Sequence, residues 1–416
     1  MTGQVRRVVG LASARVIGTA ANGIALILVA RWTGPEAFGA FSIALSIQLA
    51  VAGALGLGLP IVALRSAALG RTAAAGYAIF LNLVTSVAAA VLGLVAAAWA
   101  TGLAVWTIAL LATSVALEKN AEVRIGLGTE FGRSRVVNGV LALRGLVVLV
   151  LVVGASALGL PPLVAFVAGK CAATAVAAFL LVKHVHGWRL VTRAPRDGSL
   201  DLLGGVAVEN AVAAARQLDA TLVGVAGGAL AAGLYGAVQK VLLPITIVSG
   251  SLRVVVMGTI ARSGVARARR TVRTFFRVAL IGALVGGTLA IWAEPLVLLI
   301  LGDGYVDAAW ALRWMLLAMP AVAANPLVIT VLQDKGRARW TAVATALFTA
   351  LTLAGVWTGA ALAGATGATL ALAVVSWLRL LTVVAMSRSL RADAVDRHAA
   401  VRTPTGSSSP TLEGVK

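Results

Sequence analysis

The sequence predicts an all-α integral membrane protein with about twelve transmembrane helices. Of its 416 residues, 60% are hydrophobic and only 12% are charged, and the mean hydropathy is +0.97. Apolar runs of about 20 residues, the length that crosses a hydrocarbon layer roughly 30 Å thick, recur along the whole chain. Lys and Arg gather in alternate connections between these runs. Composition, run length and charge together exclude a soluble protein.

Twelve apolar spans are expected, each bounded by turn residues or charges. They lie near residues 8–30, 39–63, 75–99, 103–121, 136–156, 161–183, 201–226, 231–256, 274–301, 308–332, 340–360 and 364–387. The first run follows Arg6 and Arg7 and is too long for the core of a signal peptide. We therefore expect it to be retained as the first span, and we expect no sizeable extramembrane domain.

The charges of the connections predict their sides of the membrane. Most Lys and Arg lie in the two termini and in connections 65–74, 119–135, 183–200, 262–277 and 334–339. No charge at all lies in connections 100–102, 154–161, 226–231 and 359–364. The connection 293–307 holds Glu294, Asp303 and Asp307 and no base. By the positive-inside rule, the basic connections and both termini are cytoplasmic. The protein is expected in the cytoplasmic (inner) membrane of the cell.

The net charge of +20 needs no nucleic-acid partner. The densest basic run, ARARRTVRTFFR at 266–277, is predicted to lie just outside a span on the cytoplasmic side. A basic segment in that place is attracted by anionic membrane lipid. We therefore expect contact with lipid and no binding to RNA or DNA.

The chain divides into two related halves of six spans. With an offset of 194 residues, the first span and turn of each half align. The aligned residues are Ala20-Ala21 with Ala214-Ala215, Leu28-Val29 with Leu222-Val223, Gly34 with Gly228, Gly39 with Gly233, and Phe41 with Tyr235. Both halves begin on the same side, so they are expected to be parallel repeats. The predicted units are lobes 1–183 and 201–390, a cytoplasmic linker 184–200 and a disordered cytoplasmic tail 391–416.

Ionisable residues inside the spans are the candidates for function. Each costs about 2.5–3.5 kcal/mol in hydrocarbon and normally faces a cavity or a partner. They are Arg15, Arg144, Lys170, Glu209, Arg216, Asp219, Lys240, Arg253 and Arg379. Snorkelling toward the cytoplasm also explains Arg253 and Arg379, and less easily Arg144.

The stretch ARQLDATLVGV, at 215–225, places an Arg and an Asp three residues apart. Glu209, Arg216 and Asp219 are spaced by seven and three residues, which puts them on one broad helix face. Arg15 and Asn22 on the first span share the seven-residue spacing. Because polar stripes do not face lipid, we expect both to line a cavity between the lobes.

Two interpretations of Arg216 and Asp219 stay open. In one, they form an ion pair that holds the helix in register. In the other, Arg216 gives the cavity positive potential, while Asp219, with Glu209, positions it or takes up a coupling cation.

The cavity is predicted to be cationic. The unpaired positive charge of Arg15, Lys170, Arg216 and Lys240, with Asn22 beside them, favours an anionic group such as phosphate or diphosphate. No metal or cofactor site is expected, because Cys171 is the only cysteine and the three histidines lie in polar connections. The chain also lacks an ATP-binding signature, so an ion gradient or later consumption of the product would have to supply energy.

At residues 31–43, RWTGPEAFGAFSI, the chain resembles the first turn of the polysaccharide flippase family. This is the Wzx-like branch of the multidrug/oligosaccharidyl-lipid/polysaccharide exporter superfamily. Segments 216–241, 300–320 and 364–371 resemble later parts of that family in the same order. The resemblance implies a V-shaped transporter that moves an undecaprenyl diphosphate oligosaccharide from the cytoplasmic to the outer leaflet by alternating access. The chain lacks the two extra spans of the lipid II flippase branch.

The resemblance also implies partners and leaves alternatives. The substrate would be a lipid-linked oligosaccharide, and the glycosyltransferases or polymerase of surface polysaccharide biosynthesis would be its neighbours. We expect a monomer without enzyme activity. The alternatives are a drug or small-cation antiporter of the same superfamily, a membrane glycosyltransferase, polymerase or ligase, and a purely structural membrane protein.

Overall fold

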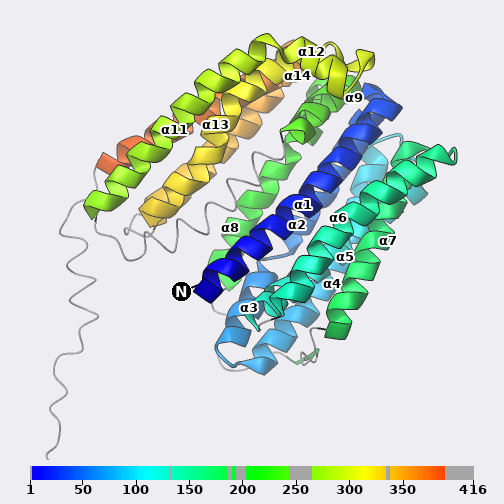
Figure 1. Ribbon diagram of the computed structural model, residues 1–416, viewed down its shortest axis with the longest axis vertical. Coiled ribbons are helices and arrows are strands. Elements are labelled where there is room, and N and C mark those ends of the chain that lie inside the picture. The colour runs from blue at the N-terminus through cyan, green and yellow to red at the C-terminus, as the bar shows by residue number, and fades with distance from the viewer. Residues whose placement is uncertain are drawn as a thin grey trace, which may run out of the picture.

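The protein is a bundle of long helices in two lobes (Figure 1). The computed structural model describes residues 2–131, 133–184, 190–193, 203–242, 265–333 and 338–388. The helices of the first lobe are α1 (Thr2–Thr33), α2 (Pro35–Leu55), α3 (Leu59–Ala68), α4 (Thr72–Ala100), α5 (Val105–Glu130), α6 (Ser134–Ala157) and α7 (Pro162–His184). The described elements of the second are α8 (Leu203–Ala215), the 3₁₀ turn η1 (Arg216–Leu218), α9 (Asp219–Val241), α11 (Val265–Ile291), α12 (Ala293–Ile300), the 3₁₀ turn η2 (Asp303–Tyr305), α13 (Ala308–Leu332) and α14 (Ala338–Arg388).

The helices follow the expected spans. Among the described residues, nine helical segments are long and apolar enough to cross a membrane. Two of them contain breaks where turns were expected: the segment that ends with α9 at Gly228, and α14 at Ala363 and Gly364. If each of these two segments counts as two spans, the nine segments give eleven spans. Helix α5, which its charged residues exclude from the nine, is the twelfth. Residues 243–256 of the expected eighth span lie outside the described residues.

Several span boundaries differ from the prediction. The expected span 39–63 is broken between α2 and α3, where Gly58 takes a left-handed conformation (φ 69°) ahead of Pro60. The expected span 274–301 is divided at Trp292, because Pro295 belongs in the first turn of a new helix rather than in a helix interior. The basic run is itself helical, since α11 begins at Val265.

The lobes share one hydrophobic core at one end of the bundle and have separate cores at the other. The shared core contains Phe41 of α2, Phe166 of α7 and Tyr235 of α9, together with residues of α12, α13 and α14. A second core, around Leu59 and Leu181, lies entirely within the first lobe. A third joins α11, α13 and α14 within the second lobe. The molecule is V-shaped, as expected: α11 and α13 diverge from the first lobe away from the shared core, whereas α8 stays against α2 and α3 (Figure 1).

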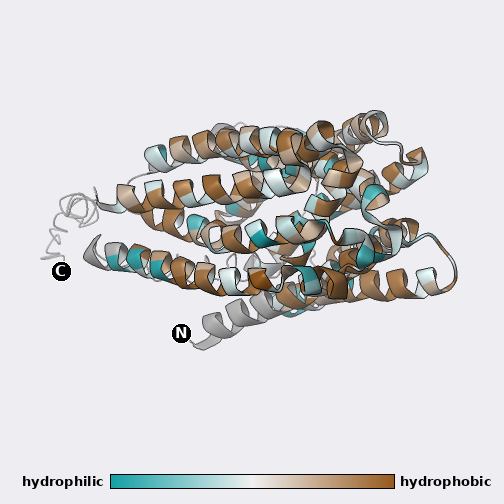
Figure 2. Ribbon diagram, turned by 90° about the horizontal axis from the view of Figure 1, so that it is seen from above, coloured by the Kyte–Doolittle hydropathy of each residue, from teal (hydrophilic) through white to brown (hydrophobic). Residues whose placement is uncertain are grey.

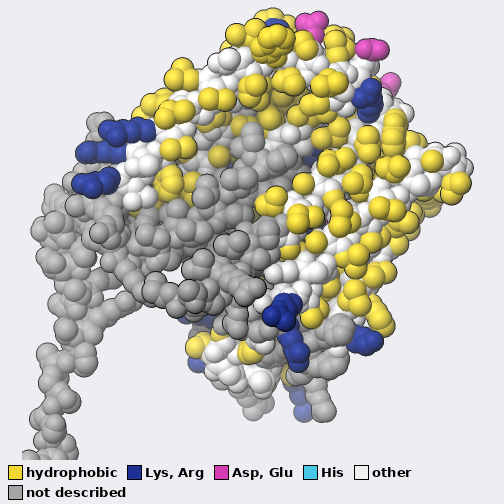
Figure 3. Space-filling model, viewed as in Figure 1, with side chains coloured by type: hydrophobic (Ala, Val, Ile, Leu, Met, Phe, Trp, Pro, Cys, Tyr) yellow, Lys and Arg dark blue, Asp and Glu magenta, His cyan; other side chains and the backbone are white. Residues whose placement is uncertain are grey.

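Charge distinguishes the two ends. The joined end carries exposed Glu36, Glu294, Asp303 and Asp307 and is called the acidic end below. The other, called the basic end, carries exposed Arg65, Arg71, Arg135, Lys183, Arg270 and Arg273. Between them the described part of the surface in Figure 3 is largely hydrophobic, and Figure 2 shows apolar residues along the lengths of the helices. Such a band between two charged rims fits a protein that spans a bilayer.

The lobes meet where α2 packs along α9, close to two glycines. Gly39 and Gly233 face each other so closely that a Cβ on Gly39 would overlap the Ala229 carbonyl oxygen. The turns before them match as well: Gly34 has φ 78° and ψ 166°, and Gly228 has φ 81° and ψ 174°. The 194-residue offset therefore pairs positions with equivalent backbone conformations, as expected for repeats.

Two further contacts close the acidic end. The Tyr305 hydroxyl donates to the Ala30 carbonyl at 3.0 Å. The Arg31 guanidinium donates to the Leu299 carbonyl at 2.8 Å. These bonds tie the end of α1 in the first lobe to η2 and to α12 in the second.

Candidate functional site

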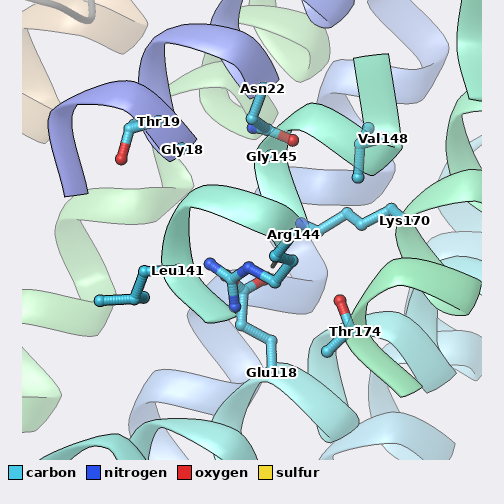
Figure 4. A pocket seen from close by; sticks show the side chains of 10 residues that line it. All are labelled: Gly18, Thr19, Asn22, Glu118, Leu141, Arg144, Gly145, Val148, Lys170 and Thr174. Atoms are coloured by element: carbon cyan, nitrogen blue, oxygen red, sulfur yellow. Dashed lines mark ion pairs between the residues drawn. The ribbon is translucent and has the colours of Figure 1, made fainter. Parts of the chain in front are cut away.

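Three charged side chains from three helices meet inside the first lobe. Arg144 of α6 lies 2.8 Å from Oε1 of Glu118 on α5, and Lys170 of α7 lies 3.2 Å from Oε2 of the same carboxylate. The three side chains are 14–25% exposed, so they are largely withdrawn from solvent. Figure 4 shows Glu118 pointing toward Arg144 and Lys170. We call these residues the charged triad, and its formal charge is +1.

A cavity of about 190 Å³, called the N-lobe cavity below, adjoins the triad. Besides the triad, its lining includes Gly18, Thr19 and Asn22 of α1, Gly145 of α6 and Thr174 of α7. Thr174 is fully buried, and its hydroxyl has no hydrogen-bond partner among the described residues. A buried polar atom without a partner is costly, so this hydroxyl is available to a molecule in the cavity.

A second cavity, of about 310 Å³, lies between the lobes and is called the interlobe cavity. The first lobe contributes polar residues of α1, α5 and α7: Asn22, Glu118, Lys119, Glu122 and Lys170. The second lobe contributes Gln217 of η1 and Lys240 of α9. Because Asn22, Glu118 and Lys170 line both cavities, the two are neighbours.

The interlobe cavity carries an excess of positive charge. Its lining holds three lysines and two glutamates, a net charge of +1. Lys119 is 3.5 Å from Glu122, and Lys170 is 3.2 Å from Glu118. Lys240 has no carboxylate within 4.0 Å in the part of the chain that the structure describes. Of the three lysines in this lining, it is therefore the one without an ion pair.

Asp219 is held away from Arg216. Its carboxylate accepts hydrogen bonds from the Tyr235 hydroxyl at 3.0 Å, the Gln239 amide at 2.6 Å and the Ala220 backbone N–H at 2.7 Å. Tyr235 and Gln239 follow the break at Gly228, so Asp219 ties the two halves of α9 together. Among the described residues Arg216 forms no ion pair, and it is exposed. The ion pair that was one interpretation of this stretch is not formed.

The 3₁₀ turn η1 is positioned by α2. The Ser46 hydroxyl donates to the Gln217 carbonyl, and the Thr221 hydroxyl lies 2.8 Å from the Ser46 oxygen. Nearby, the Asn210 amide donates to the Gly53 carbonyl. These bonds place Gln217 at the interlobe cavity while the chain passes from α8 to α9.

The predicted site residues fall into three groups. Asn22, Lys170 and Lys240 line the interlobe cavity, although Lys170 is paired with Glu118 rather than free. Arg216 and Asp219 are not in its lining. The side chains of Arg15 on α1 and Glu209 on α8 lie outside the described residues.

Sequence reasoning missed Glu118, which lies at the centre of the site. Glu118 lay within the expected fourth span, 103–121, but was left out of the ionisable residues expected inside the spans, whereas α5 continues to Glu130 and has Glu118 near its middle. The signal was its spacing from Glu122, four residues on, which places both carboxylates on one face of a long helix. Arg144, which snorkelling explained less easily than Arg253 and Arg379, forms an ion pair with Glu118.

The described residues contain no group of three or more His, Cys, Asp and Glu side chains that could hold a metal ion. No protein-family model matches the chain, and no curated protein matches it.

Solved structures do match it. An inward-facing multidrug resistance MATE family transporter of the MOP superfamily superposes with a TM-score of 0.70 at 14% identity, over 94% of this chain and 96% of that one. The chain has the fold of the MATE transporters. An outward-facing MATE family transporter gives a TM-score of 0.65 at 15% identity with the same coverage.

A third similar structure is a MOP superfamily transporter from Pyrococcus furiosus, with a TM-score of 0.66 and 15% identity over 94% of this chain and 96% of that one. It is described as having a binding pocket of reverse polarity that suggests a different function. Polarity of the pocket therefore varies among proteins of this fold.

Proposed function

We propose that this protein is a transporter that moves a lipid-linked oligosaccharide, with an undecaprenyl diphosphate carrier, from the cytoplasmic to the outer leaflet. The observation that carries the proposal is the interlobe cavity, where Lys170 and Lys240 lie on opposite lobes. Phosphate groups are recognised by such charge-assisted contacts. A diphosphate bound between the two lysines would contact both lobes at once, so it would influence how they close.

The shape of the molecule supports alternating access. The lobes share a core at the acidic end and have separate cores at the basic end. If the basic end is cytoplasmic, as the positive-inside rule predicts, this is the state that receives substrate from the cytoplasm. The MATE-like fold and the better match to an inward-facing transporter support the same assignment.

An antiporter for drugs or small cations is the second candidate. Glu118 and Glu122 line the interlobe cavity, and several structures with this fold are multidrug transporters. Against this, each of these glutamates lies next to a base, whereas Lys240 has no carboxylate partner among the described residues. The cavity therefore favours an anion. The Pyrococcus furiosus transporter is a precedent for a different pocket polarity in this fold.

The test is the flipping of lipid-linked oligosaccharide by purified protein in liposomes. Lys170→Ala/Lys240→Ala should lower the rate at least about tenfold, since it removes a charge-assisted contact from each lobe. Lys183→Ala, which removes an exposed lysine at the basic end of α7, is the matched control and should keep the wild-type rate.

An unchanged flipping rate in the double variant would refute the proposal. Efflux of a cationic dye that depends on Glu122, without any flipping activity, would establish the antiporter instead.

A further inference from the structure

We propose that Glu118 is a built-in counter-ion that occupies an anion site made by Arg144 and Lys170, and that a phosphate group of the ligand takes its place. This inference rests on the proposed function and deepens it, because it names where one phosphate of the diphosphate binds on the Lys170 side of the interlobe cavity. It also assigns Glu118 a role opposed to binding: the carboxylate competes with the ligand.

The geometry of the triad is that of an oxyanion held by two cations. Each carboxylate oxygen of Glu118 contacts a different base, Arg144 at 2.8 Å and Lys170 at 3.2 Å. The bases come from α6 and α7, so the carboxylate bridges two helices besides its own. A phosphate offers several oxygens of the same kind and can make the same two contacts.

The N-lobe cavity gives a ligand room and further contacts. Its volume of about 190 Å³ equals that of several water molecules, about 30 Å³ each in the liquid, and suffices for a phosphate group. The Thr174 hydroxyl, buried and without a partner in the described part of the chain, can donate to it. Asn22 lines both this cavity and the interlobe cavity, so it marks the way in from the space between the lobes.

The counter-ion explains how the site exists without a ligand. Arg144 and Lys170 would repel each other if both were unpaired in a membrane-embedded lobe, and isolated charges there are costly. Glu118 neutralises one of the two charges. Because it is tethered, its effective concentration at the site is high. A monovalent anion of low affinity cannot displace it, whereas a phosphate with more than one charge has the stronger attraction.

The experiment measures binding of inorganic pyrophosphate to the full-length protein in detergent by calorimetry. Glu118→Gln should bind pyrophosphate at least about tenfold more tightly than wild type, since it removes a negative charge within a few ångströms of the ligand. Glu36→Gln, the same change at an exposed position of the acidic end, should bind like wild type.

The cationic side of the site is tested in the same way. Arg144→Gln should weaken binding at least about tenfold, whereas Arg135→Gln, at an exposed position on the same helix, should not. If Glu118→Gln does not fold, Glu118→Asp serves instead, because its shorter side chain cannot hold both bases and should also tighten binding. Farnesyl diphosphate in place of pyrophosphate distinguishes the source: tighter binding of the lipid indicates a lipid diphosphate, and equal binding indicates a free phosphate.

Equal affinity of wild type and the Glu118 variants would overturn the counter-ion role, and an Arg144→Gln protein that binds like wild type would overturn the anion site. Neither result would affect the conclusion drawn from the flipping assay of Lys170→Ala/Lys240→Ala. Conversely, wild-type flipping by that double variant, together with tighter pyrophosphate binding by Glu118→Gln, would refute the proposed function and leave the anion site in place.

Discussion

Lys170 and Lys240 have the same chemistry and both lie in apolar spans, yet their surroundings differ. Lys170 is held by Glu118 in the charged triad, whereas Lys240 faces the interlobe cavity without a carboxylate within 4.0 Å among the described residues. The charge of Lys170 is therefore neutralised by Glu118 until a ligand arrives. Lys240 has no ion pair to break, which suits it to the first contact with an anion that enters between the lobes.

Asp219 differs from Glu118 in that its donors are neutral groups. Its carboxylate accepts bonds from Tyr235, Gln239 and a backbone N–H, and among the described residues it forms no ion pair with a base. Such an arrangement holds α9 together across Gly228. It favours a positioning role for Asp219 within its own lobe over uptake of a coupling cation.

Tyr235→Phe should lower the free energy of unfolding by about 2 kcal/mol, because it removes a buried hydrogen bond to a charged group. Tyr305→Phe removes a hydroxyl that donates to a neutral carbonyl, so it should cost about 1 kcal/mol. Equilibrium unfolding of the purified protein in mixed detergent measures both. Equal costs would show that the charge of Asp219 adds nothing to its bond with Tyr235.

The contact of α2 with α9 depends on glycine. Around Gly39 and Gly233 the two backbones approach so closely that neither position has room for a side chain. Each glycine follows a turn at a glycine with positive φ, Gly34 in one lobe and Gly228 in the other. The contact between these two equivalent segments closes the acidic end. Alternating access would require α2 and α9 to separate there.

Gly39→Val should prevent that closure, since its Cβ would overlap the Ala229 carbonyl oxygen. The lobes would then separate at the acidic end. Spin labels on Glu36→Cys and Asp307→Cys, in a Cys171→Ser background, should report a longer distance between the lobes than in the protein with Gly39. Gly139→Ala is the control, because nothing lies within 4 Å of the added carbon.

An unchanged distance between these labels in Gly39→Val would mean that α2 and α9 do not control the opening of the acidic end.

For the molecule as a whole, the arrangement of the cores links shape to orientation. One core joins the lobes at the acidic end, whereas separate cores hold each lobe together at the basic end. The exposed bases of the basic end are those that the positive-inside rule places in the cytoplasm. We therefore expect the interlobe cavity to be reached from the cytoplasm in the state described here.

A cysteine at the interlobe cavity tests this orientation. Gln217→Cys in a Cys171→Ser background should react with a membrane-impermeant thiol reagent in inside-out vesicles and not in right-side-out vesicles. Glu36→Cys at the acidic end should show the opposite pattern. Reaction of Gln217→Cys from the outside only would reverse the proposed orientation.

Hydropathy, charge alternation and the glycine pattern were enough to predict about twelve helices, two lobes and equivalent turns at Gly34 and Gly228. These features depend on local properties: the length of apolar runs, the cost of charge in hydrocarbon and the backbone freedom of glycine. Which polar side chains form ion pairs and hydrogen bonds could not be predicted from these local properties. Glu118, Arg144 and Lys170 come from three helices, and the pairing of Asp219 with Tyr235 spans a break in α9. Which side chains become partners depends on helix rotation and packing, which the order of residues along the chain does not specify.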